Sequence, residues 1–254
     1  MNKNTKTERP ILFNSEMVKA ILSGNKTQTR RIMRRQPDAV EYFKRGEVTA
    51  DTDAKHAILR CYDNPKGFKN CASGWSADAT YKTPFSEFNV GDQLWVRETF
   101  MDLSGTGVEH RDLNGKLQRY AYGANCPRGS HSDELRKDFG LKWKPSIHMP
   151  RSASRLVLEI TNIRVERLND ISEADAIAEG LKPVSVPDYV PVDDGYTRAN
   201  RTIWKGYQNN ERAYRDTAKD SFMSLWQSVY GADSWVANPW VWVIEFKVIE
   251  GASQ

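Results

Sequence analysis

The clearest strand signal in the chain is the segment LVLEITNIRV, residues 156–165. Its apolar side chains alternate up to Ile160 and resume in the opposite phase at Ile163. A period of two is the pattern of a β-strand with one buried face, and a change of phase predicts a bulge or bend, here near residues 161–162. We therefore expect a core strand that is distorted near its middle.

A short helix is expected directly after this strand. Ser172 and Asp175 have the spacing of a capping box, with aspartate in place of the usual glutamate or glutamine. Gly180 supplies the left-handed residue that commonly ends a helix. The helix should therefore end at Glu179.

The same signals predict the remaining elements on either side of this strand and helix. Ser15 is expected to cap a first helix that stops at Gly24, and Gly231 closes a longer amphipathic helix. The predicted helices cover residues 16–23 and 222–230, and the predicted strands cover about 27–31, 93–98, 119–122 and 240–249. Because short strands outnumber helices, the predicted class is α+β, a small mixed β-barrel with a few packed helices.

Long polar segments without a sustained period lie between these elements. We interpret them as irregular insertions in one domain that covers residues 10–250 and follows a disordered tail at residues 1–9. The predicted insertions are residues 36–88, 101–118, 125–145 and 182–219.

Composition excludes several classes of protein. The chain has 254 residues, of which 39% are hydrophobic, and no apolar run approaches the roughly 20 residues of a membrane span. The polar start of the sequence lacks the apolar core of a signal peptide, and three irregularly spaced cysteines cannot form a full disulfide framework. We therefore expect a cytoplasmic protein with no membrane contact and no obligate protein partner.

Residues 24–31, GNKTQTRR, concentrate the groups that are capable of chemistry. If the strand starts near Thr27, a period of two places Thr27, Thr29 and Arg31 on one face, while Lys26 in the turn can swing beside Thr29. Together with Arg30, Arg34 and Arg35, these residues put five cations within ten positions. Such a cluster can bind phosphates, although a solvated basic face explains it equally well at a net charge of only +4.

Several segments together resemble the ASCH family of PUA-like barrels, especially the larger versions encoded by bacteriophages and prophages. They are ILSGNKTQTRR (21–31), GDQLWVRE (91–98), SIHMPRSASR (146–155), residues 156–181 with ISEADAIAEGL, and WVWVIEFKVI (240–249). The G-x-K-x-x-T-x-R string is the most specific of them. The resemblance implies a PUA-like barrel in a bacterial host cell.

Some small ASCH proteins are amidohydrolases that remove the acetyl group of N4-acetylcytidine with a lysine, a threonine and a glutamate. The resemblance carries these roles to Lys26, Thr29 and Glu179. We expect Thr29 to attack the acyl carbon, Lys26 to take its proton, and Glu179 to protonate or orient the leaving N4. The expected substrate is a modified cytosine nucleoside or nucleotide, free or within RNA or DNA, with no cofactor.

Further residues are predicted to contact substrate or phosphate, in addition to this catalytic trio. Arg31 and backbone amides could hold an oxyanion or a phosphate. His148 precedes the core strand and lies three residues before an arginine, although a structural histidine bonded to the backbone is the competing explanation. The predicted contact residues are Arg30, Arg31, Glu98, His148 and Arg151.

Two other functions fit the same sequence. A non-catalytic PUA-like module could bind a modified base or RNA by stacking on aromatic side chains, for which Trp75, Trp95, Trp143, Trp204, Trp235 and Tyr122 are candidates. A ribonuclease could use Lys26, Arg31 and His148. No metal site is predicted, because neither His56 with Cys61 and Cys71 nor Cys126 with His131 has a metal-binding spacing.

Overall fold

The computed structural model describes residues 7–33, 36, 39–44, 47–49, 56–60, 90–111, 115, 117–126, 129–192, 195–207 and 214–251. Most of the predicted insertion at residues 36–88 and of the predicted tail lies outside the described residues, as do Arg34, Arg35, Cys61, Cys71 and Trp75. No described helix is both long enough and apolar enough to cross a membrane.

The chain forms two compact units. Unit 1 consists of Met1–Gly24, Val90–Ile160 and Phe246–Gln254, and unit 2 consists of Asn25–Asn89 and Thr161–Glu245. Two long strands, β11 (Leu156–Arg167) and β15 (Trp240–Gly251), contribute residues to both units. The boundary in β11 falls between Ile160 and Thr161, where the sequence pattern changes phase.

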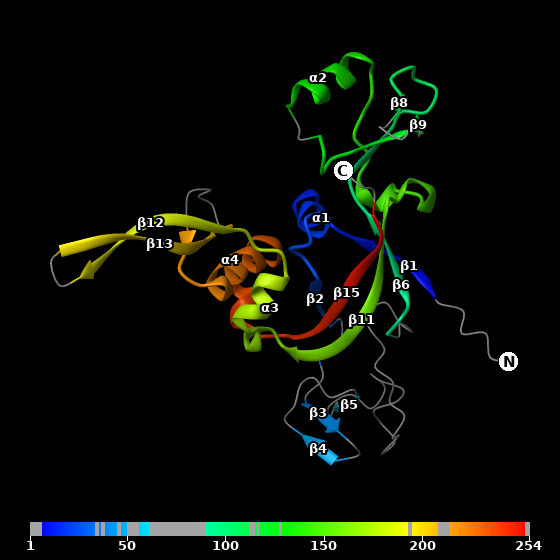
Figure 1. Cartoon of the computed structure of the whole chain (residues 1–254). Helices are drawn as coiled ribbons and strands as arrows, with labels where there is room; N and C mark the ends of the chain where they lie inside the picture. Colours follow the sequence, from blue (N-terminus) through cyan, green and yellow to red (C-terminus); the bar gives the residue numbers. More distant parts are fainter. Residues whose placement is uncertain are drawn as a thin grey trace. The chain divides into compact units, whose positions relative to one another are not determined.

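The largest sheet has the strand order β1-β6-β11-β15-β2 (Figure 1). It is mixed, because β1 (Glu8–Leu12) runs parallel to β6 (Gln93–Arg97), whereas β6 and β11 are antiparallel and so are β15 and β2 (Gln28–Ile32). The α+β class is thus observed. Among the described strands no pairing joins β1 to β2, so closure of this sheet into a small barrel is not confirmed.

Unit 1 adds short elements to its part of the sheet. They are helices α1 (Ser15–Leu22) and α2 (His131–Asp138), strands β7 (Phe100–Asp102), β8 (His110–Arg111), β9 (Leu117–Gln118) and β10 (Tyr120–Tyr122), and 3-10 turns at Ser146–His148 and Arg151–Ala153. The helix α1 ends before Gly24 as predicted, with a φ of 73° at the glycine. Its cap is Asn14 and not Ser15, because the Asn14 side chain accepts the N–H of Met17 at 2.8 Å.

Helix α2 corrects the prediction that residues 125–145 are wholly irregular. Its polar sequence hides it from a periodicity search, but Ser130 caps it by accepting the N–H of Asp133. The buried Asp133 carboxylate in turn accepts bonds from Gly129 N and from Trp143 Nε1, at 2.7 and 2.6 Å. Polar bonds therefore fix the start of this helix.

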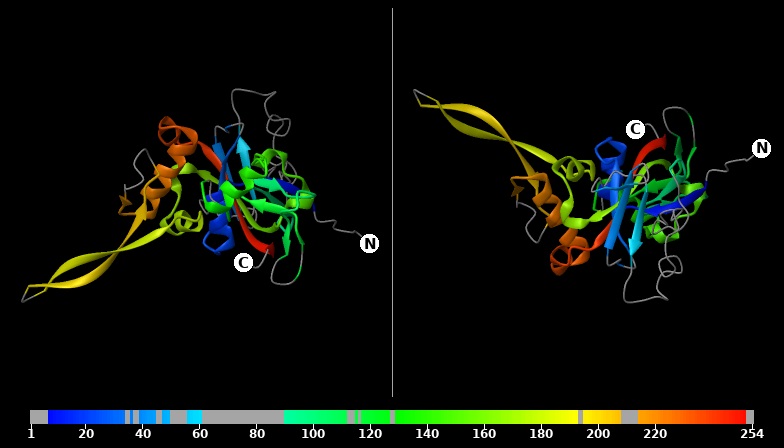
Figure 2. Two further views of the ribbon diagram at one scale, coloured as in Figure 1. Left: turned by 90° about the horizontal axis from the view of Figure 1, so that it is seen from above. Right: turned by 90° about the horizontal axis from the view of Figure 1, so that it is seen from below.

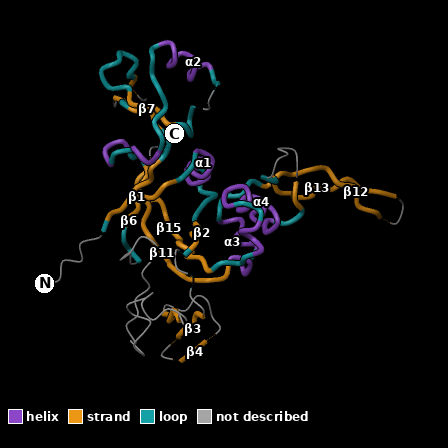
Figure 3. The backbone as a smooth tube through the Cα atoms, turned by 180° about the vertical axis from the view of Figure 1, so that it is seen from behind, coloured by secondary structure: helices purple, strands orange, loops and turns teal. Residues whose placement is uncertain are grey.

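Unit 2 is built on strands β2, β11 and β15 with two main helices against them (Figures 1 and 3). Its remaining elements are β3 (Ala39–Lys44), β4 (Glu47–Thr49), β5 (His56–Arg60), a 3-10 turn at Leu168–Asp170, α3 (Glu173–Ala178), β12 (Pro183–Val192), β13 (Gly195–Lys205), β14 (Tyr214–Arg215), α4 (Ala218–Tyr230) and α5 (Asp233–Val236). Strand β3 pairs with both β4 and β5, so the described part of the 36–88 segment contains a small sheet.

The two faces of the unit 2 sheet differ in what they carry. We call the side toward α3 and α4 the helix face; here Val241 and Val243 pack with Phe222 and Trp226 of α4. Side chains alternate along strands, so the neighbouring positions point to the opposite side. We call that side the tryptophan face, because Trp240 and Trp242 lie on it with Met33, Ile163 and Val165.

Residues 182–219, predicted to be irregular, form a long antiparallel ribbon of β12 and β13, extended by β14 (Figures 1 and 2). The sequence suggested a loop because β12 contains Pro183, Pro187 and Pro191. These prolines are four residues apart and therefore have the same parity along the strand. Since β12 is an edge strand of its sheet, all three nitrogens can point to the open side without interrupting the pairing with β13.

Candidate active site

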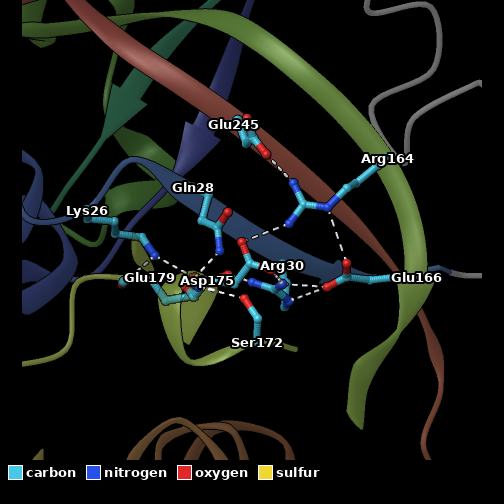
Figure 4. Close-up of polar contacts among 9 residues, drawn as sticks. All are labelled: Lys26, Gln28, Arg30, Arg164, Glu166, Ser172, Asp175, Glu179 and Glu245. Atoms are coloured by element: carbon cyan, nitrogen blue, oxygen red, sulfur yellow. Dashed lines mark hydrogen bonds and ion pairs between the residues drawn. The ribbon is translucent and has the colours of Figure 1, made fainter. Parts of the chain in front are cut away.

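Lys26 and Glu179, two of the three residues predicted to be catalytic, are in direct contact (Figure 4). The Lys26 ammonium donates to Glu179 Oε2 and to the Glu179 carbonyl oxygen, both at 2.8 Å. Lys26 is 2% exposed and Glu179 is 7% exposed. Glu179 follows the last turn of α3. The backbone N–H of Thr27, the residue after Lys26, donates to the carbonyl of Ala178, the residue before Glu179, and this bond holds the two segments together.

The third residue, Thr29, does not join this contact. It lies on β2 between Gln28 and Arg30, and both of these neighbours bond to groups on the helix face. Alternation therefore places Thr29 on the tryptophan face, paired in register with Ile244 of β15. The predicted shared face of Thr29 and Arg31 agrees with this register, but within the described residues no hydrogen bond joins the Thr29 hydroxyl to Lys26 or Glu179.

Arg30 connects Glu179 to a larger set of charges. Its Nη1 donates to Glu179 Oε1 at 3.1 Å, its Nε donates to Glu166 at 2.9 Å, and its Nη2 lies 3.2 Å from Asp175. The Arg30 side chain is fully buried. We predicted a phosphate contact for this arginine, but its engagement with three carboxylates favours a role in positioning Glu179.

Arg164 completes what we call the charge cluster. It contacts Asp175 and Glu166 at 3.0 and 3.2 Å and also bonds to Glu245. The cluster thus contains the cations Lys26, Arg30 and Arg164 and the carboxylates Glu166, Asp175, Glu179 and Glu245 (Figure 4). All seven residues belong to unit 2.

Burial and neighbouring charges shift the pKa values of two groups in the charge cluster, Lys26 and Asp175. Burial lowers the pKa of Lys26 below its usual value; the Glu179 carboxylate opposes this shift, while Arg31 and Arg30 add to it. Burial alone would raise the pKa of Asp175, but Arg164 and Arg30 outweigh it and lower the pKa. A lysine whose pKa is lowered is neutral more often than an ordinary lysine and is therefore better suited to accept a proton.

The other predicted contact residues lie in separate places. Arg31 is half-buried on the tryptophan face. Glu98, His148 and Arg151 belong to unit 1: the buried Glu98 is bound by Arg155, His148 is exposed, and the exposed Arg151 forms an ion pair with Glu8 at 2.6 Å.

The aromatic residues predicted to form a base pocket do not form one group. Trp95 and Tyr122 each lie under an arginine of unit 1, and Trp143 donates to Asp133. Trp204 and Trp235 pack instead on the apolar core around α4 in unit 2. Trp240 and Trp242, which the sequence predicts only as residues of a strand, lie together on the tryptophan face.

Sequence reasoning also missed most of the carboxylates of the charge cluster. A signal was present, since Arg164 and Glu166 are oppositely charged residues on the same side of a strand whose other side carries the apolar Ile163 and Val165, and a charge buried in a core strand needs a partner. Asp175 was assigned to helix capping alone. Ser172 does cap α3 through the N–H of Asp175, but the Asp175 carboxylate faces the arginines.

Within the described residues no group of three or more histidine, cysteine, aspartate or glutamate side chains is arranged to hold a metal ion. Comparisons with protein-family models, with curated proteins and with solved structures found no match to this chain.

Proposed function

We propose that the chain is an ASCH-type hydrolase that cleaves the amide of an N4-acylated cytosine, and that Lys26 and Glu179 form its proton-transfer pair. The observation that carries this proposal is the buried contact of 2.8 Å between the Lys26 amine and the Glu179 carboxylate. The lysine belongs to the G-x-K-x-x-T-x-R string, and the glutamate ends a helix that follows β11, the central strand of the sheet order. Both positions support the resemblance to the ASCH family and its PUA-like barrel.

The reaction assigns a proton to each group. The Thr29 hydroxyl attacks the acyl carbon, and its proton passes to the neutral amine of Lys26. The bond from the acyl carbon to N4 then breaks while the proton passes through Glu179 to N4, and water hydrolyses the acyl-threonine ester. Because Thr29 lies on the tryptophan face, this step requires the amine to leave Glu179 and turn around the start of β2.

Purified variants incubated with a panel of N4-acylated cytidines test this assignment. Lys26→Met and Thr29→Ala should each lower the rate of acid release by at least about a hundredfold, because a general base and a nucleophile are lost. The matched controls are Lys19→Met and Thr27→Ala, which change exposed residues close by in the sequence and should leave the rate unchanged. A wild-type protein that releases no acid rules out the function, and an active Thr29→Ala variant would make water the nucleophile.

The dependence of the rate on pH gives a second test. If the neutral amine of Lys26 is the base, the rate rises as the pH passes its pKa, which burial lowers. Glu179→Gln removes a charge and a hydrogen bond that raise this pKa, so the midpoint should move to lower pH. A midpoint that is the same in both proteins would show that Lys26 is not the group that titrates.

A non-catalytic binding module is the second candidate, and the burial of the site favours it. Lys26, Thr29 and Glu179 are at most 7% exposed, so the ion pair can serve simply to fasten α3 to β2. In that case oligonucleotides should bind with a steep salt dependence and without product formation. The same panel, supplemented with plain and modified oligonucleotides, separates the two functions. It also detects the cleavage expected of a ribonuclease.

A further inference from the structure

The ribbon of β12 and β13 has two edges that differ in their chemistry. The outer edge of β12 carries the three prolines described above. The outer edge of β13 contains no proline, and among the described strands only β14 pairs with it, at Trp204 and Lys205. From Gly195 to Ile203 we call this second edge the open edge, because no described strand pairs with it.

The register shows which backbone groups face the open edge. The prolines of β12 lie opposite Trp204, Asn200 and Tyr196, and a pair whose proline nitrogen points outward exchanges no backbone bonds. At the alternate positions the groups point the other way, since the N–H of Lys205 donates to the Lys182 carbonyl that leads into β12, at 3.4 Å. The even-numbered residues of β13 therefore direct their N–H and C=O groups to the open edge. Within this edge they are Tyr196, Arg198, Asn200 and Thr202.

The open edge is complementary to itself about its midpoint. It runs from Gly195 to Ile203, and Ala199 lies halfway between them. An antiparallel pairing centred on Ala199 sets Gly195 of one copy opposite Ile203 of another, and it ends where β14 occupies the edge. In this register neither Arg198 nor Arg201 lies opposite an arginine, so no like charges face each other directly.

The ribbon is fixed to the rest of unit 2 only at its base in the described contacts with α4. There the Ser221 hydroxyl donates to the Lys205 carbonyl at 2.6 Å, and Ile203 is buried. From this base the ribbon leads away from α4 (Figure 2). Two strands alone are marginally stable in water, and further strands stabilise them. The exposed side chains farther along β13 are Arg198, Asn200, Arg201 and Thr202.

We propose that β13 pairs with β13 of a second copy of this chain, antiparallel and about a two-fold axis at Ala199. The product is a continuous sheet with the order β12-β13-β13-β12, whose two outer edges are both proline-bearing β12 strands. Because the contact uses the same edge of both chains, it consumes the open edges and stops at a dimer. The charge cluster takes no part in this contact, so the inference is independent of the proposed hydrolase.

Sedimentation equilibrium of the full chain tests the dimer. The wild type should have about twice the mass of the 29.0 kDa chain at micromolar concentration. Asn200→Pro removes an N–H that faces the open edge but none that faces β12, and should raise the dissociation constant at least about tenfold. Asn200→Ala is the matched control, because it removes the same side chain, keeps the N–H, and should stay dimeric.

A disulfide tests the position of the axis. In the proposed register the two Ala199 residues face each other as a pair without backbone bonds, with Cα atoms about 4.5 Å apart, which a disulfide can span. Ala199→Cys should therefore give a covalent dimer on a non-reducing gel after mild oxidation. Arg201→Cys is the matched control on the same face, since its counterpart in the second copy is displaced along the strand. Both variants retain Cys61, Cys71 and Cys126, so any background from these thiols is equal.

Several outcomes would overturn the inference. A wild-type chain that remains monomeric up to its solubility limit excludes the dimer. An Asn200→Pro variant that is folded by circular dichroism and still dimeric places the contact elsewhere, and equal cross-linking of Ala199→Cys and Arg201→Cys rejects the axis. If Asn200→Pro does not fold, the comparison of the two cysteine variants decides. None of these readouts depends on acid release, so the hydrolase proposal stands or fails separately.

Discussion

Each unit of the molecule holds a buried glutamate against an arginine, but the two arrangements differ in how the charge is shared. In unit 1, Arg155 is the one cation bonded to Glu98 among the described residues, through two parallel bonds of 2.8 and 3.0 Å. In unit 2, Glu179 accepts hydrogen bonds from Lys26 with one carboxylate oxygen and from Arg30 with the other. Arg30 also contacts the carboxylates of Glu166 and Asp175. One carboxylate has a dedicated partner, and the other shares its partners with a network.

The comparison bears on the role that we propose for the Lys26–Glu179 pair. A two-pronged arginine pair satisfies both carboxylate oxygens and fixes their geometry, which suits a structural link. Burial raises the pKa of Glu98 although Arg155 opposes the shift, and no lysine or second carboxylate joins the pair among the described residues. The network instead contains a buried lysine whose pKa is lowered by burial, which is the property that the proposed role of Lys26 as a base requires.

The largest expected effect comes from removing the shared cation. Arg30→Met leaves Glu166, Asp175 and Glu179 without their common partner, and breaking a buried ion pair in this way costs about 3–5 kcal/mol of unfolding free energy. Urea denaturation measures the loss. Arg30→Lys, which restores the charge but not the planar fork, should recover part of it. A loss below about 1 kcal/mol for Arg30→Met would mean that the carboxylates find other partners and that the network is not a unit.

The pH dependence of stability should have opposite signs in the two units. The raised pKa of Glu98 means that its contribution is fully present below its unfolded value near 4.5 and is lost as the pH rises through the folded pKa. The lowered pKa of Asp175 means that its contribution is present above 3.8 and is lost as the pH falls through the folded pKa. Each group changes the unfolding free energy by at most about 1.4 kcal/mol per pH unit.

Two neutral variants measure these slopes. The unfolding free energy is measured by urea denaturation from pH 3 to 7 and compared with that of the wild type. In Glu98→Gln it should no longer contain the part that falls as the pH rises. In Asp175→Asn it should no longer contain the part that falls as the pH is lowered. If both substitutions changed the curve in the same direction, the contrast between the two units would be wrong.

The smallest expected effects come from the helix caps. Asn14→Ala in unit 1 and Ser172→Ala in unit 2 should each cost about 1 kcal/mol, because each removes one acceptor for a backbone N–H at the start of a helix. Only Ser172→Ala acts on the helix that leads to Glu179, so only this variant should move the midpoint of the pH–rate profile. A shift of that midpoint in Asn14→Ala would show that the effect is not specific to the site.

Periodicity was sufficient to predict most of the regular elements. The apolar alternation before Arg97 and after Trp240 predicted β6 and β15, and Gly24, Gly180 and Gly231 marked three helix ends correctly. These signals are local, because a strand face or a helix stop depends on residues close in sequence. The ribbon of β12 and β13 was not predicted, because proline is tolerated in a strand only at the edge of a sheet. The sequence of one strand does not reveal whether that strand lies at an edge.

The candidate site was predictable only in part. The resemblance selected Lys26 and Glu179, which do meet, and the period of two placed Thr29 and Arg31 on the same side as observed. The sequence also allowed Lys26 to swing toward Thr29, whereas its amine lies on Glu179 instead. Which carboxylate captures a flexible lysine depends on contacts 153 residues apart in the chain, and no local pattern encodes that choice.

The spacing of the three prolines in β12 has a consequence for self-association. An exposed strand edge normally presents a row of backbone donors on which another chain can pair and begin to aggregate. Pro183, Pro187 and Pro191 are all turned to the open side, and proline has no N–H. Every second outward-facing position of the edge therefore lacks the backbone donor with which an incoming strand would pair. The ribbon can thus extend into solvent with little risk of acting as a template for fibril growth.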